Sequence, residues 1–158
     1  MSTTSAPSIQ GPVCAGAPGP GQLDPRGPQV AAALTSVVLV AVLLLPAPIS
    51  TALLAVQAAF FAIGAGRGVQ ATPYAWVFRT LVRPRLSAPT DWEDPQPPRF
   101  AQAVGLAFAV LGLVALLAGA TLVGQVAVGA ALVAALLNAV FAFCLGCEVY
   151  LLARRMVS

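Results

Sequence analysis

Two long runs without a charged residue dominate this chain. They extend from Gly27 to Gly66 and from Phe100 to Cys147, which is 40 and 48 residues. About 20 helical residues cross the hydrocarbon core of a bilayer, roughly 30 Å thick, so each run has room for two spans. The composition agrees, because 59% hydrophobic and 8% charged residues cannot give a soluble domain a solvated surface. We therefore predict an all-α membrane protein with four transmembrane helices.

Prolines divide the first apolar run, and a segment bounded by glycines divides the second. Pro46 and Pro48 remove backbone donors close together and end a helix. Gly119 and Gly124 enclose a short uncharged stretch, which is a softer break. The predicted spans are residues 29–46, 49–66, 101–119 and 122–144.

Four segments follow from this division. Residues 1–28, which include Cys14, are rich in Pro and Gly and predict a disordered tail without the apolar stretch of a signal peptide. Residues 29–66 are the first transmembrane hairpin, and residues 67–99 are a cytoplasmic loop. Residues 100–155 are the second hairpin, which ends in a Cys-x-x-Cys motif.

All eight basic residues are arginines, and all fall on one side of this topology. They precede the first span, occupy the central loop and follow the fourth span. The turns inside the two hairpins carry no charge. Because Arg in short loops and flanks stays in the cytoplasm, we expect a multi-pass protein of a bacterial cytoplasmic membrane with both termini in the cytoplasm. The lipid bilayer is then its first partner.

The central loop contains a pattern typical of a short interfacial helix over about 73–83. Thr72 suits the N-cap and Pro73 the first helical position. Aromatic and basic side chains follow and are candidates for contact with lipid or a partner, namely Tyr74, Trp76, Phe78, Arg79, Arg83 and Arg85. The helix is either an anchor that fixes the loop or a binding surface for anionic lipid or a soluble partner.

The two hairpins begin alike, which predicts an internal duplication. Asp24-Pro25-x-x-Pro28 recurs 70 residues later as Asp94-Pro95-x-x-Pro98, and each copy leads into a span. Pro presets the geometry of the first turn, and Asp can accept hydrogen bonds from exposed backbone donors. The ends of the hairpins also match, as Phe-Ala-Ile-Gly-Ala over 61–65 and Phe-Cys-Leu-Gly-Cys over 143–147.

Small residues repeat every seven positions along the third and fourth spans. Gly105, Gly112 and Gly119 form one such stripe, which favours close helix packing. Asn138 is expected to bond across to Gln102 or Gln125. These amides either hold the helices together or line a transport path. No ionised residue interrupts a span before Glu148, which argues against a proton or ion pathway.

Cys144, Cys147 and Glu148, at the exit of the fourth span, are the candidate catalytic residues. The cysteines are spaced i and i+3, within reach of a disulfide on a helix. We expect this exit to be a helix C-terminus, which disfavours a thiolate. A thiol pair for redox or sulfur chemistry, half of a zinc site and plain packing residues all remain open. Zinc would require either a second copy of the chain, which leaves a homo-oligomer open, or Glu148 plus another group.

Several classes of function are excluded or not indicated. The chain has no His, which excludes imidazole-based catalysis and the commonest metal ligand. The net charge of +3 is distributed around lipid-length apolar runs, so nucleic-acid binding is not expected. No motif for a cofactor is present.

Three motifs together resemble those of a bacterial membrane family known as domain of unknown function 4395. They lie at Asp24–Pro28, at Tyr74–Leu86 and at Phe143–Tyr150, and the resemblance covers about 22–155. The family brings no established activity. The chain is also similar, more weakly, to four-helix membrane thiol oxidoreductases of the disulfide-bond formation B and vitamin K epoxide reductase kind. Those proteins keep a Cys-x-x-Cys beside a quinone, but this chain lacks a second pair to pass electrons on.

Our leading hypothesis is a thiol-redox or sulfur-handling accessory, whose Cys144/Cys147 pair exchanges electrons or sulfur with a soluble cytoplasmic thiol protein. The alternative is a non-enzymatic membrane scaffold or assembly subunit, with the 73–83 helix as its docking surface and the cysteines as packing residues.

Overall fold

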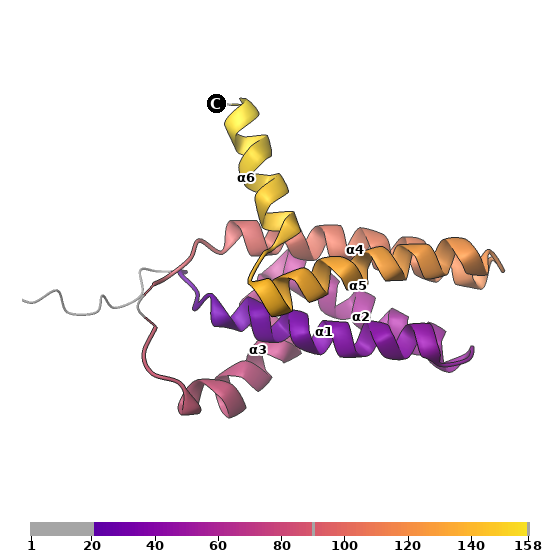
Figure 1. Cartoon of the computed structure of the whole chain (residues 1–158), viewed down its shortest axis with the longest axis horizontal. Coiled ribbons are helices and arrows are strands. Elements are labelled where there is room, and N and C mark those ends of the chain that lie inside the picture. Colours follow the sequence, from indigo (N-terminus) through magenta and orange to yellow (C-terminus); the bar gives the residue numbers. More distant parts are fainter. Residues whose placement is uncertain (1–20, 90, 158) are drawn as a thin grey trace, which may run out of the picture.

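The computed structural model describes residues 21–89 and 91–157, and these are almost entirely helical. Four long helices, α1 (Arg26–Leu44), α2 (Ile49–Arg67), α4 (Gln96–Leu117) and α5 (Thr121–Phe141), lie alongside one another (Figure 1). Within the described ranges, these four are long and apolar enough to cross a membrane. The prediction of an all-α membrane protein is confirmed. The bounds differ from the predicted spans by up to five residues: α1 and α4 begin earlier than predicted, and α1, α4 and α5 end two or three residues before the predicted ends.

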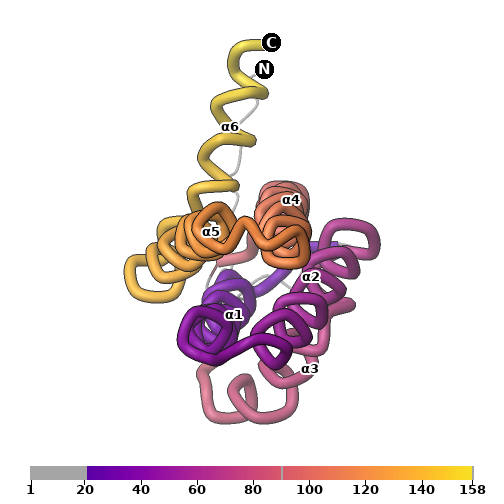
Figure 2. The backbone as a smooth tube through the Cα atoms, turned by 90° about the vertical axis from the view of Figure 1, so that its right-hand side faces the viewer, coloured from indigo at the N-terminus to yellow at the C-terminus, as the bar shows by residue number. Residues whose placement is uncertain are grey.

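The four helices form a ring in which each helix has two neighbours. Seen from the end, α1 and α2 make one layer and α4 and α5 the other, with α5 over α1 and α4 over α2 (Figure 2). The buried centre consists of small and branched apolar side chains and one aromatic ring: Leu39, Val42, Leu54, Ala58, Phe61, Ala109, Val128 and Ala131. The outer surface is apolar as well; Leu117 and Leu122, for example, are 71% and 74% exposed. Such a surface indicates a lipid environment.

All eight arginines are located toward one end of the bundle, which we call the basic end. There α1 and α4 begin and α2 and α5 end, and the chain between α2 and α4 lies on this side (Figure 1). The opposite end carries only the short turns 45–48 and 118–120. The structure thus segregates charge along the bundle axis as the sequence predicted.

Both hairpins begin with the same local contact. The Asp24 carboxylate accepts a hydrogen bond from the Arg26 backbone N–H at 3.0 Å, and Asp94 accepts one from the Gln96 backbone N–H at 2.8 Å. The ends differ, because residues 61–65 lie inside α2 whereas 143–147 lie beyond α5. Each hairpin begins and ends at the basic end, and the common origin of the two hairpins stays a prediction.

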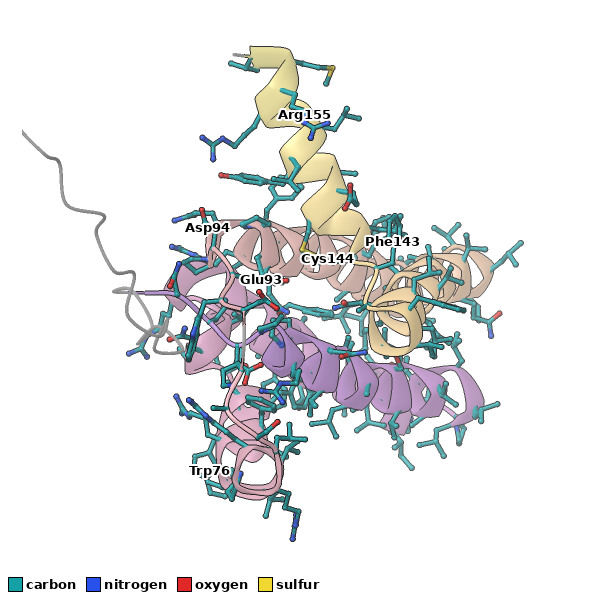
Figure 3. All side chains as sticks on the ribbon, turned by 60° about the vertical axis from the view of Figure 1, so that its left-hand side comes forward. Trp76, Glu93, Asp94, Phe143, Cys144 and Arg155 are labelled. Atoms are coloured by element: carbon teal, nitrogen blue, oxygen red, sulfur yellow. A yellow bond between two sulfur atoms is a disulfide. The ribbon has the colours of Figure 1, made fainter. Side chains whose placement is uncertain are left out.

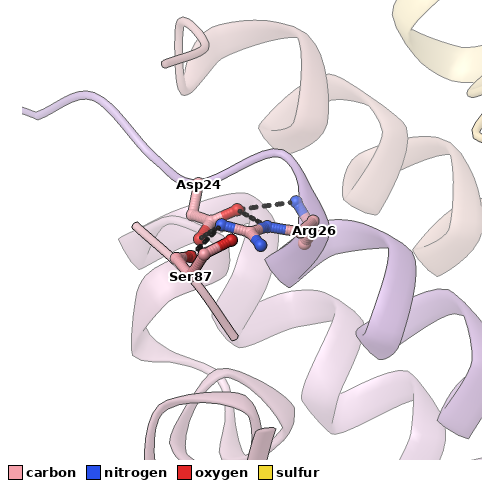
Figure 4. Close-up of polar contacts among 3 residues, drawn as sticks. All are labelled: Asp24, Arg26 and Ser87. Carbon is pink, nitrogen blue, oxygen red and sulfur yellow. Dashed lines mark hydrogen bonds and ion pairs between the residues drawn. The ribbon is translucent and has the colours of Figure 1, made fainter. Parts of the chain in front are cut away.

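Residues 21–28, which we expected to belong to the disordered tail, are structured. Leu23 pairs with Glu93 in an isolated β-bridge and is 4% exposed. Asp24 is buried and ion-paired with Arg26 at 3.0 Å. The Arg26 guanidinium also donates to the Ser87 carbonyl at 3.0 Å (Figure 4). The Arg26–Ser87 hydrogen bond and the Leu23–Glu93 bridge attach the start of α1 to the loop before α4. Residues 1–20, with Cys14, lie outside the described part.

A second arginine joins the two hairpins. Arg99, in the first turn of α4, donates through its guanidinium to the Ala65 carbonyl at 3.2 and 3.3 Å and to the Gly66 carbonyl at 2.9 Å. Carbonyls in the last turn of a helix have no partner within that helix. Arg99 therefore caps α2 from α4 and complements its negative end.

Two of the three predicted packing glycines lie at helix contacts. A Cβ at position 105 would lie 2.9 Å from Cε1 of Phe61, and one at position 112 would lie 3.1 Å from Cγ2 of Val128. Gly119 instead lies in the turn before α5 with φ +80°, a backbone conformation that favours glycine. Asn138 makes no hydrogen bond to Gln102 or Gln125 within the described ranges; a nearby bond joins the Gln29 amide to the Ala139 carbonyl at 3.1 Å.

Candidate functional site

The chain breaks between α5 and a further helix, α6 (Leu145–Val157), and this break defines the site. The sequence predicted a span that continued to residue 144, but α5 ends at Phe141 and Ala142 adopts a left-handed conformation with φ 53°. A straight continuation would carry Glu148 and two arginines along the direction of the span. The break lets α6 turn away from the bundle axis instead (Figures 1 and 2).

The two cysteines lie at the N-terminus of α6 and are joined by a disulfide. Their Cα atoms are 5.2 Å apart, within the range that a disulfide requires. The Cys147 backbone N–H donates to the Cys144 sulfur at 3.3 Å, and the Glu148 N–H donates to the Cys144 carbonyl at 3.0 Å. Cys144 therefore takes the N-cap position.

This location reverses the electrostatics expected from the sequence. We predicted a helix C-terminus at the motif, where backbone carbonyls disfavour a thiolate. The break at Ala142 instead places Cys144 where the backbone N–H groups of a new helix point. The positive end of a helix stabilises a thiolate and is the usual location of reactive Cys-x-x-Cys pairs. Glu148 is exposed in the first turn of α6.

A cavity of about 540 Å³ borders the disulfide. Its walls come from the starts of α1 and α4, the linker before α4, the end of α5 and the first turns of α6. Both cysteines are half-buried in this wall, and Asn138 and Glu148 contribute to it. Glu93 and Asp94 line the same cavity and lie on the side where Cys144 is found (Figure 3). The pair is thus open to a molecule that approaches at the basic end.

The residues that the structure describes at this site do not form a complete ligand set for a metal ion. Within the described ranges, no group of three or more His, Cys, Asp or Glu side chains is placed to hold a metal ion. Cys144 and Cys147 make two ligands at most, and a structural zinc site takes four. The arrangement is suited to thiol–disulfide chemistry rather than to ligation within one chain.

The predicted loop helix exists and forms what we call the α3 segment, residues 73–85. It begins with α3 (Pro73–Val77), continues as a π-helical turn (Phe78–Val82) and closes with a 3₁₀ turn (Arg83–Arg85). As predicted, Thr72 caps it, since its hydroxyl accepts from the Ala75 N–H at 3.3 Å. The wider π-helical turn directly precedes Pro84. Proline has no backbone N–H, and its ring clashes with the preceding turn of a regular α-helix.

The two faces of the α3 segment differ. Tyr74 and Phe78, which we expected to contact lipid or a partner, pack inward instead; Phe78 is 4% exposed and lies against Gly27. Trp76 is 60% exposed and points away from the bundle (Figure 3). The three arginines of the segment are exposed as well: Arg79, Arg83 and Arg85.

A polar chain inside the bundle was missed from the sequence. The Tyr74 hydroxyl donates to Oε1 of Gln57 at 2.7 Å, and the Gln57 amide donates to the Thr35 hydroxyl at 3.4 Å. Gln57 is 1% exposed. Burial raises the pKa of Tyr74 above its usual 10.0, an effect that a hydrogen bond with Thr35 lessens. The sequence contained one signal for this polar chain, the amide of Gln57 inside the second span.

The fold and its apolar exterior define a multi-pass α-helical membrane protein with a cysteine pair at one end of a four-helix bundle. The chain belongs to the family described as Domain of unknown function (DUF4395), whose model matches residues 23–155. No curated protein and no solved structure matches the chain significantly.

Proposed function

We propose that Cys144 and Cys147 exchange their disulfide with a dithiol of a soluble protein at the cytoplasmic face of the membrane. The observation that carries this proposal is the position of the disulfide, at the N-terminus of α6 and in the wall of an open cavity at the basic end. Arginine-rich flanks stay in the cytoplasm, which favours this side for the basic end.

The two cysteines have different roles in this exchange. Cys144 accepts the hydrogen bond from the Cys147 N–H and is nearer the positive end of α6, so its thiolate is the better leaving group. A partner thiolate therefore attacks the Cys147 sulfur. The Cys144–Cys147 bond breaks, a mixed disulfide forms on Cys147, and Cys144 leaves as a thiolate that takes up a proton.

The partner's second thiolate then completes the step. It attacks the partner's own sulfur in the mixed disulfide and releases Cys147, which takes up the second proton. The partner dithiol is oxidised to a disulfide, and the pair is reduced by two electrons. The same steps in reverse oxidise the Cys144/Cys147 dithiol and reduce a partner disulfide. The direction of exchange therefore depends on the reduction potential of the partner.

Trapping of the mixed disulfide tests the assignment. In a Cys14→Ser background, the oxidised full-length chain in proteoliposomes is mixed with a reduced thioredoxin-fold protein whose second active-site cysteine is replaced by serine, so that the partner cannot complete the exchange. After an acid quench and alkylation of free thiols, peptide mass spectrometry of the adduct locates the mixed disulfide, which we expect on Cys147 with Cys144 alkylated. Cys144→Ser/Cys147→Ser is the matched control and should form no adduct.

Two results count against the proposal. A mixed disulfide found equally on Cys144 and Cys147 removes the distinction between the cysteines. A chain whose thiols stay reduced when oxidant is supplied, and which forms no adduct, contradicts thiol exchange altogether.

A scaffold role is the second candidate, and one observation favours it. On the α3 segment, Trp76 and Leu81 are 60% and 53% exposed, beside exposed arginines, so these two apolar side chains are not used for packing in the bundle. A docking surface for an assembly partner would use them. A Trp76→Ala chain that loses function while Cys144→Ala/Cys147→Ala retains it would favour the scaffold over thiol exchange.

A further inference from the structure

Helix α6 leaves the bundle close to the start of α4 and then runs away from it. A Cβ at position 146 would lie 2.6 Å from Cα of Ala101, so the two backbones meet there. The rings of Phe100 and Tyr150 follow, with centroids 5.7 Å apart. Beyond this contact α6 extends outward, across the direction of the four long helices (Figures 1 and 2).

Three sides of α6 have three different surroundings. Gly146 and Tyr150 face α4. Cys147, Glu148 and Leu151 line the cavity at the basic end. Since a helix advances about 100° per residue, positions 145, 149, 152 and 156 share the remaining side. We call these four residues the apolar stripe; they are Leu145, Val149, Leu152 and Met156, exposed by 38%, 53%, 59% and 75%.

The apolar stripe is turned away from both the cavity and α4. The cavity occupies the side of α6 toward the basic end, and the centre of the stripe lies roughly 120° around the helix from it, so the stripe is turned toward the bilayer rather than toward the aqueous side. Ala101 lies five residues into α4, which is about 7.5 Å along its axis at 1.5 Å per residue. At this depth a helix that runs across the spans lies at the boundary between headgroups and acyl chains.

We propose that α6 lies on the bilayer surface at the basic end, with its apolar stripe in the acyl-chain boundary and Arg154 and Arg155 at anionic headgroups. The stripe continues the lipid-facing surface of α5, where Val140 and Phe141 are 65% and 73% exposed. Both arginines fall in the last turn of α6, away from the stripe, and the upper part of the helix carries Arg155 in Figure 3. Basic residues beside an apolar face are typical of helices that bind anionic membranes.

This arrangement goes beyond thiol exchange and does not depend on it. It fixes the first turn of α6, and with it Cys144 and Cys147, at the water–lipid boundary. A molecule that enters the cavity from the basic end then meets the cysteine pair at the membrane surface.

Tryptophan fluorescence of the full-length chain in nanodiscs tests the proposal. The Trp76→Phe/Trp92→Phe chain supplies the background, and Leu152→Trp reports on the stripe. Leu151→Trp is the matched control, because Leu151 is the sequence neighbour of Leu152 but lines the cavity. We expect Leu152→Trp to emit further to the blue and to be quenched several-fold more strongly by lipids brominated near the carbonyl. Iodide should quench Leu151→Trp more strongly.

A third arm tests the charge. Arg154→Gln/Arg155→Gln should lessen quenching of Leu152→Trp by brominated lipid in phosphatidylglycerol nanodiscs and leave it unchanged in phosphatidylcholine. Size-exclusion profiles of all variants report whether they fold. Equal quenching at 151 and 152 overturns the proposal. So does a Leu152→Trp that neither quencher reaches, since a second copy or another protein would then cover the stripe.

Discussion

A single buried amide connects the interior of the bundle to its basic end. Gln57 takes part in both hydrogen bonds of the chain from Thr35 to Tyr74, so each of its two side-chain groups has a partner. An unpaired amide at this depth would lose more than the bond itself, because Gln57 is buried and the lost partner is not replaced by bulk solvent. The inward position of Tyr74 is therefore a requirement of α2 rather than of the membrane surface.

Removal of the Tyr74 hydroxyl should destabilise the protein. Tyr74→Phe leaves Oε1 of Gln57 without its donor, which costs about 1–3 kcal/mol. Thermal unfolding in detergent measures the loss. The exposed control, Trp76→Phe, should change the midpoint little, and a similar drop in both would mean that the hydrogen bond is unimportant.

Alkaline pH should act through the same residue. The pKa of Tyr74 is raised in the folded protein, so folding favours its protonated form. Its contribution to stability is complete below the unfolded pKa of about 10 and is lost as pH rises through the raised folded value. The unfolding midpoint should fall less steeply above pH 10 for Tyr74→Phe than for the parent chain. Parallel pH profiles would contradict this.

At the scale of elements, charge-free runs and prolines were enough to predict four spans and a capped loop helix. They did not indicate where α5 ends. Residues 141–145 are apolar and lack the Gly or Asn that normally marks a left-handed helix end, so Ala142 gives no signal. The break depends instead on α6 packing against Ala101, a long-range contact that periodicity does not contain. The cysteines were therefore identified, but their electrostatic setting was not.

Substitution of Ala142 by glycine distinguishes a break after α5 from a continuous helix. Ala142→Gly removes a left-handed penalty of roughly 1–2 kcal/mol and should raise the unfolding midpoint. If α5 continued to residue 144, the same change would cost about 1 kcal/mol, as expected inside a helix. Ala139→Gly, within α5, serves as the control and should lower the midpoint.

A larger residue at position 112 should separate α4 from α5. Gly112→Leu inserts a side chain where even a Cβ would lie 3.1 Å from Val128, and overpacking of this kind costs about 1–3 kcal/mol. Gly129→Leu is the matched control, since no atom lies within 4 Å of its added Cβ. Thermal unfolding in detergent should separate the two variants; equal midpoints would show that the α4–α5 contact is loose.

For the whole molecule, one end of the bundle is basic and the other carries no charge. The sequence predicted this separation of charge, because all eight arginines precede, separate or follow the two hairpins and none lies in a hairpin turn. The tie between residues 23–26 and the linker could not be predicted, since it joins segments about 60 residues apart through a backbone carbonyl. For the same reason the cavity walls, which come from four helices and the linker before α4, were not foreseen.

The orientation of the bundle has a direct test. In a chain without native cysteines, Ser87→Cys marks the basic end and Ala47→Cys the opposite turn; both positions are exposed. In intact cells, a membrane-impermeant maleimide should label Ala47→Cys only, and in inverted vesicles Ser87→Cys only. The opposite pattern would place the basic end outside.

The cap that Arg99 provides to α2 affects how the molecule is made. During synthesis the first hairpin emerges with its last carbonyls unpaired, and the guanidinium that satisfies Ala65 arrives 34 residues later. The second half of the chain thus completes a helix that the first half begins. Despite their similar beginnings, the halves are not interchangeable parts: a gene that encoded two copies of the first hairpin would produce a helix end with no guanidinium to close it.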